Sequence, residues 1–150
     1  MTDDKDPKLA IFELYLATAE RVSDRRAQAN SWMLSVNSAI VALYGYLQSD
    51  KMAVGATQKA VWLCAIPAAG AIVCLAWWAL LASYRELNRA KFEVLAELEA
   101  GFPISPIKRE RQIYQKHGRR SFNQIERLIP GCFAVLYAIL LVAALWTRGA

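Results

Sequence analysis

The sequence predicts an all-α integral membrane protein with three transmembrane helices, two of which extend into a cytoplasmic helical bundle. Three segments, 31–47, 60–84 and 129–147, contain no Asp, Glu, Lys or Arg. A helix needs about 20 mostly apolar residues to cross a bilayer, and the hydrophobic content of 56% exceeds the roughly 45–50% of soluble proteins. The first segment reaches that length only with its polar flanks, so it is the weakest of the three predicted spans.

The positive charges give the three spans an orientation. Of the 18 basic residues, five precede the first segment, two lie in 48–59, ten lie in 85–128 and one, Arg148, follows the third segment. Basic residues are enriched in cytoplasmic loops. Because the two basic parts fall on the same side of a three-span chain, we expect the N-terminus in the cytoplasm and the C-terminus outside.

Four helical segments are predicted within a single membrane domain, 1–150. The first, 7–47, begins with Asp6 as N-cap and a first-turn proline, and it runs on into the first span. The second, 59–100, is the second span with a cytoplasmic rod. A short basic helix at 106–117 follows, with Ser105 as its N-cap. The fourth segment, 121–147, contains the third span.

The rod that extends the second span is amphipathic. Its apolar residues recur at helical spacing on one face, opposite a charged face. A chain this small has little else to cover such a face, so these residues are predicted to make contacts between subunits of a homo-oligomer. The predicted oligomer contacts are Leu87, Val94, Leu95 and Leu98.

The first span is the polar one. Its polar residues lie on two adjacent stripes of the predicted helix and should avoid lipid. We favour contacts between helices, where an interhelical hydrogen bond contributes about 0.6–2 kcal/mol. The alternative is a water-filled path in an oligomer. The residues concerned are Asn30, Ser31, Ser35, Asn37 and Ser38.

Charged residues flank the spans in two groups. One group lies at a similar predicted depth near the membrane surface, where a lone carboxylate would be partly desolvated, and is predicted to form ion pairs: Arg25, Arg26, Arg85, Lys91 and Glu126. The other is a basic run, predicted to contact anionic lipid headgroups, with an acidic protein or nucleotide partner as the alternative: Lys108, Arg109, Arg111, Lys116, Arg119 and Arg120.

Catalytic motifs are missing from the sequence. It has no HExxH, GxSxG, P-loop or GxGxxG pattern, and the three cysteines, Cys64, Cys74 and Cys132, have no metal-ligand spacing and suit packing. We therefore expect no enzyme activity, no cofactor, no metal site and no nucleic-acid partner. The spans also lack the charged residue that ion-coupled transporters generally use.

Three stretches in order resemble a known family: SDRRAQANSWMLSVNSAIVALYGYL, WWALLASYRELNRAKFEVLAELEAGFP and SFNQIERLIPGCFAVLYAIL. They are similar to the RipA family of octameric bacterial membrane proteins, over most of the chain. That resemblance implies eight subunits, a bacterial inner-membrane location and a cytoplasmic portion built from the helix extensions, and it does not imply an enzymatic activity. A more distant similarity is to two-span membrane effector domains of nucleotide-signalling defence systems.

The function expected is a non-enzymatic, homo-oligomeric assembly in the inner membrane that is structural or channel-like. One alternative is a membrane-disrupting effector of a stress or defence response. Another is a small transporter, which the uncharged spans disfavour. The sequence identifies no solute and no cytoplasmic protein partner.

Overall fold

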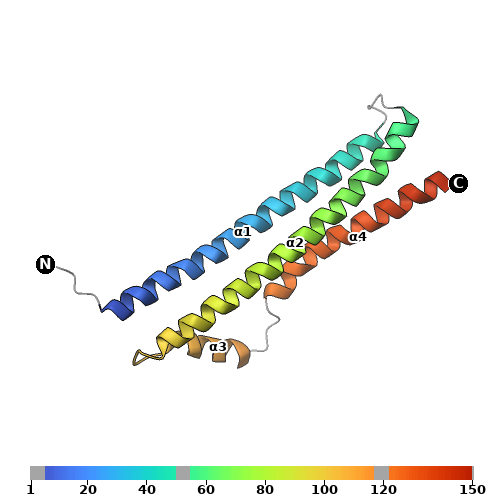
Figure 1. The fold of residues 1–150 in the computed structure, drawn as a ribbon. Coiled ribbons are helices and arrows are strands. Elements are labelled where there is room, and N and C mark those ends of the chain that lie inside the picture. Colours follow the sequence, from blue (N-terminus) through green and yellow to red (C-terminus); the bar gives the residue numbers. More distant parts are fainter. Residues whose placement is uncertain (1–5, 50–54, 117–121, 150) are drawn as a thin grey trace. The chain divides into compact units, whose positions relative to one another are not determined.

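The computed structural model describes residues 6–49, 55–116 and 122–149. Over these residues the chain forms four helices and no strand, so the predicted all-α class is confirmed for the described part (Figure 1). The helices are α1 Pro7–Gln48, α2 Ala56–Glu99, α3 Pro106–Lys116 and α4 Phe122–Gly149. At 1.5 Å per residue, α1 and α2 are each more than about 60 Å long.

Two of the helices are long and apolar enough to cross a membrane. These are α2 and the part of α4 from Glu126 to Thr147, whose most apolar 18-residue stretches have mean hydropathies of 2.1 and 2.5. Helix α1 contains the predicted first span, but it is not among these candidates, because serine and asparagine lower the hydropathy of its apolar segment. Crossing by α1 therefore stays a prediction.

The helices contribute to two compact units. Unit 1 comprises Met1–Gln28 and Ala82–Ser121, and unit 2 comprises Ala29–Leu81 and Phe122–Ala150. The long helices α1 and α2 each supply residues to both units. Unit 2 therefore contains the predicted spans 31–47 and 129–147 and most of the span 60–84, and unit 1 contains the charged extensions.

Unit 1 buries apolar residues between α1 and α2. Ala19, Val22 and Leu95 are all less than 10% exposed, and Leu95 is completely buried. Polar contacts surround this core: Lys91 Nζ donates a hydrogen bond to Thr18 Oγ1 at 2.9 Å. The same ammonium lies 5.1 Å from the ring centroid of Tyr15, within the range of a cation–π contact.

A buried carboxylate fixes the start of α3. Glu99, at the end of α2, is 1% exposed, and its carboxylate accepts hydrogen bonds from the backbone N–H groups of Ile107 at 2.6 Å and Lys108 at 3.1 Å. Ser105 is in the N-cap position, because its carbonyl accepts the N–H of Arg109. The free N–H groups of the first turn thus bind Glu99, and the negative charge suits the positive end of the helix dipole.

The apolar core of unit 2 lies toward one end of its helices. Buried Tyr44, Leu47 and Ile66 form a cluster, with partly buried residues packed against it. The cluster draws on all three helices of the unit, because Ile40 and Leu63 flank it from α1 and α2, and Leu140 from α4.

Candidate functional site

Asn37 is the centre of a buried polar cluster in unit 2. Its side chain is 0% exposed. The amide oxygen accepts hydrogen bonds from the Cys74 thiol at 3.3 Å and the Tyr137 hydroxyl at 3.1 Å. The amide nitrogen donates to the Met33 carbonyl, one turn earlier in α1, at 2.8 Å. Two donors face the oxygen and an acceptor faces the nitrogen, so one side chain joins α1 to both α2 and α4.

A second polar cluster lies about two turns earlier along α1. The Asn30 amide oxygen accepts a hydrogen bond from the Trp77 indole N–H at 2.9 Å. Its amide nitrogen donates to a Glu126 carboxylate oxygen at 3.4 Å. Asn30 thus repeats the arrangement of Asn37, because it also contacts α2 and α4. The spacing of seven residues places both asparagines on the same face of α1.

The approach of α2 to α4 depends on a glycine. A Cβ added at Gly70 would lie 2.5 to 2.7 Å from three ring carbons of Tyr137, which is closer than real Cβ contacts come. Gly70 therefore leaves the space that the Tyr137 ring occupies. Because that ring carries the hydroxyl bonded to Asn37, the close approach and the hydrogen bond belong to one arrangement.

The predicted polar stripe of α1 divides into two parts. Asn30 and Asn37 face α2 and α4, as the favoured helix-contact hypothesis requires. Ser31, Ser35 and Ser38 are exposed, and the Ser35 hydroxyl donates to the Ser31 carbonyl at 3.0 Å. Within the described residues, none of the three serines forms a side-chain hydrogen bond to α2 or α4.

The four predicted oligomer contacts differ in exposure. Leu95 is completely buried within unit 1, so its side chain packs inside a single chain and leaves no surface for a second one. Val94 and Leu98 are half-buried, and Leu87 is 47% exposed. Contact between subunits through Leu87 stays a prediction.

The residues predicted to pair near the membrane surface make varied contacts. Arg85 forms an ion pair with its neighbour Glu86 at 3.6 Å, and both side chains are largely exposed. Lys91 bonds Thr18, Glu126 bonds Asn30, and Arg25 is exposed while Arg26 is half-buried.

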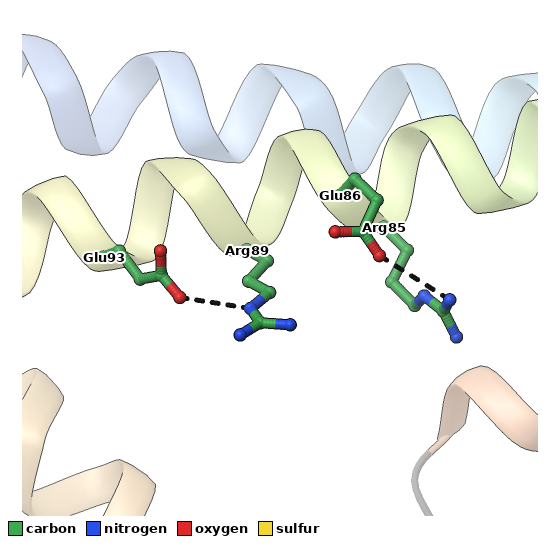
Figure 2. Close-up of polar contacts among 4 residues, drawn as sticks. All are labelled: Arg85, Glu86, Arg89 and Glu93. Atoms are coloured by element: carbon green, nitrogen blue, oxygen red, sulfur yellow. Dashed lines mark hydrogen bonds and ion pairs between the residues drawn. The ribbon is translucent and has the colours of Figure 1, made fainter.

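An exposed ion pair one turn further along α2 was not predicted. Arg89 Nε donates to Glu93 Oε1 at 3.1 Å, and Figure 2 shows both side chains extending from α2 on the side away from α1. The hydrogen bond to Glu93 and the nearby negative charge raise the pKa of Arg89 above its ordinary value. Arg89 therefore stays charged at any pH at which the protein would be studied.

The predicted lipid-contacting run falls only partly on described side chains. Lys108 and Arg109 are exposed on α3. Arg111 and Lys116 belong to α3, but their side chains lie outside the described part. Arg119 and Arg120 lie outside the described residues altogether.

Five residues that the structure places at buried contacts had no assigned polar or close-contact role in the sequence. They are Gly70, Cys74, Trp77, Glu99 and Tyr137. A signal existed for three of them, because the spacings of four and three residues place Gly70, Cys74 and Trp77 on one face of α2. Among the described residues, no three His, Cys, Asp or Glu side chains gather as a metal site.

Comparison with known proteins gives a family. Residues 9–146 match the octameric membrane protein family, 8xMP. No curated protein and no solved structure shows a match to the chain. The match covers nearly the whole sequence and agrees with the predicted membrane location and eightfold self-association. The RipA name and the likeness to defence effectors stay predictions from the sequence. The chain belongs to the octameric membrane protein family.

Proposed function

We propose that this chain is a non-enzymatic subunit of a homo-octamer in a bacterial inner membrane, and that its role there is structural. The family match supports an octameric membrane protein. The structural role rests on Asn37, because that residue is the most polar buried group in the apolar part of the chain. The hydrogen-bond partners of its amide therefore indicate whether the apolar helices pack against one another or line a water-filled path.

Asn37 is committed to contacts inside one chain. Its side chain is 0% exposed, its oxygen accepts from two helices and its nitrogen donates within α1. A residue that lines a water-filled path has to present polar atoms to water. Because these atoms are already bonded, Asn37 supports helix packing and opposes the pore-lining hypothesis for this residue.

The same contacts support three transmembrane helices. Helix α1 hydrogen-bonds to α2 and α4 through Asn30 and again through Asn37, two turns apart. Both partners are apolar enough to span a bilayer. A helix bonded to two spans at successive levels shares their depth, and its polar side chains find partners there instead of lipid.

Cysteine labelling in sealed vesicles tests this topology. With three spans and a cytoplasmic N-terminus, Ser105→Cys should react from the cytoplasmic side and Gly149→Cys from the opposite side. A membrane-impermeant maleimide added to right-side-out and inverted vesicles gives the measurement. Reaction of both sites from the same side would require an even number of crossings and would overturn the proposal.

The structural role predicts what Asn37→Leu does. Loss of the amide leaves the Cys74 thiol and the Tyr137 hydroxyl without their Asn37 Oδ1 acceptor, so the free energy of unfolding should fall by about 0.6–2 kcal/mol. Ion flux through the purified protein in liposomes should stay at the wild-type level. Gln58→Leu is the matched control, because the Gln58 amide is exposed and its loss should change neither quantity.

Flux measurements separate this role from the other candidates. An Asn37→Leu protein of unchanged stability with altered flux would establish the channel-like alternative. Loss of membrane potential when the wild-type chain is expressed would favour a membrane-disrupting effector. Flux that depends on one added solute would favour a transporter.

A further inference from the structure

The exposed faces of unit 2 differ between helices. On α4 the exposed residues are mostly large and apolar: Val135, Ile139 and Val142 are each about 60% exposed. The most apolar 18-residue stretch of α4 has a mean hydropathy of 2.5, and only 17% of that stretch is buried in the chain. Lipid tails solvate such a surface, so the outer face of α4 needs no protein to cover it.

Helix α1 also exposes large apolar residues, such as Trp32 and Leu43, but along one side it exposes a different surface. Ser31, Ser35, Ser38, Ala42 and Gly45 are all exposed, and their alternating spacing of four and three residues aligns them along one side of the helix, here named the α1 face. Three of the five carry a hydroxyl group. Helix α1 is also the one of the three helices in unit 2 that fails the test for a membrane span. Lipid is therefore a poor solvent for this face.

We propose that the α1 face packs against a second copy of the chain in the octamer, an inference that rests on the proposed function. A second copy is the occupant to expect, because the family is octameric and each subunit of a closed ring must contact two neighbours. In lipid, helices associate through close backbone approach and polar contacts, which small and hydroxyl-bearing residues permit.

Open space at Gly45 agrees with this assignment. A Cβ added at Gly45 would meet nothing of its own chain within 4 Å, whereas one at Gly70 would collide with Tyr137. The Tyr137 ring of the same chain thus explains why residue 70 has no side chain. At Gly45, as at Gly131, the described part of the subunit leaves open space, and on the α1 face that space would admit another helix.

Leucine substitutions on two faces test the proposal. Ser38→Leu and Gly45→Leu enlarge the α1 face, and Ala138→Leu and Ala143→Leu are matched controls at exposed positions of α4. The mass of each purified full-length protein is measured by light scattering in detergent and compared with eight chains of 16.8 kDa. We expect the α1 variants to shift to smaller species and the α4 variants to keep the wild-type mass.

Crosslinking gives a second measurement that does not depend on dissociation. A photo-crosslinking side chain at position 38 should form covalent dimers on irradiation in membranes, and the same side chain at position 138 should form none, because a ring interface places position 38 against a different residue of the neighbouring subunit. Reaction of Ser38→Cys with a charged, water-soluble thiol reagent in the intact octamer would instead show a wet surface and overturn the proposal.

The outcomes separate this inference from the proposed function. A wild-type protein that is not octameric contradicts the proposed function. An octameric wild type whose α1 variants are also octameric, with wild-type helical content by circular dichroism, contradicts only the assignment of the α1 face. Equal dissociation of the α1 and α4 variants also contradicts it, because the effect would then not depend on the face.

Discussion

Units 1 and 2 differ in the residues that they expose and in the polar groups that they bury between helices. In unit 1, charged pairs such as Arg89 and Glu93 are exposed, and apolar Leu95 is completely buried. In unit 2, apolar Ile139 is exposed and polar Asn37 is completely buried. The same long helices supply both units. The difference agrees with the proposed location, in which lipid surrounds unit 2 and water surrounds unit 1.

Each arrangement follows from the solvent that suits its surface. Water drives apolar side chains together, so unit 1 gains from burying leucine and alanine between its helices. Lipid tails are as apolar as leucine, so unit 2 can leave large apolar residues such as Ile139 exposed beside its small apolar core. What remains for unit 2 is close packing and hydrogen bonds, and the Gly70, Tyr137 and Asn37 contacts supply both.

The largest loss of stability is expected in unit 1. Leu95→Ala should lower the free energy of unfolding by about 2–5 kcal/mol, because a completely buried leucine leaves a cavity. Leu87→Ala, eight residues earlier in the same helix and 47% exposed, should change it by less than about 0.5 kcal/mol. Thermal unfolding followed by circular dichroism measures both.

The Leu87→Ala variant also tests the sequence-based prediction that Leu87 contacts another subunit. If Leu87 contacts another subunit, Leu87→Ala should reduce the mass by light scattering while leaving the helical content unchanged. A wild-type mass would remove Leu87 from the interface. A Leu95→Ala protein as stable as the wild type would mean that burial in unit 1 does not stabilise the chain.

An intermediate loss of stability is expected in unit 2. Gly70→Ala should lower the free energy of unfolding by about 1–3 kcal/mol, since the new methyl group must displace the Tyr137 ring. Gly131→Ala is the control, because nothing lies within 4 Å of a Cβ there and alanine favours a helix over glycine. We expect Gly131→Ala to be neutral or stabilising.

A double substitution shows whether the two residues act together. Gly70→Ala combined with Tyr137→Ala should cost less than the sum of the two single changes, because removal of the ring makes room for the methyl group. Additive costs would show that Gly70 matters for a reason other than Tyr137.

Much of the fold could be predicted from the sequence. Gly101 and Pro103 indicate the end of α2, and Asp6 with Pro7 indicates the start of α1, because these residue types have local preferences that need no distant contact. The cap of α3 was harder. The serine at 105 has the right local chemistry, but the N–H groups bind Glu99, six residues earlier in the chain.

Only the α1 residues of the candidate site could be predicted from the sequence. Asn30 and Asn37 stand out because amides are rare in apolar helices and share one face at a spacing of seven. Their partners could not be identified in the same way. Cys74 and Tyr137 are ordinary residues of apolar helices, and which of them meets Asn37 depends on how α2 and α4 pack against α1.

The smallest effect is expected at the surface of unit 1, where Arg89 and Glu93 form the pair drawn in Figure 2. The pair is one helical turn apart, and both side chains are more than half exposed, so water and salt screen their attraction. Arg89→Gln, Glu93→Gln and the double variant should all unfold at the wild-type temperature within experimental error, at low and at high salt. A clear loss of stability in both single variants, absent from Gln58→Ala at another exposed position of α2, would mean that the pair is shielded from water. The most direct source of such shielding is a neighbouring subunit, in which case the charged surface of unit 1 would also take part in assembly.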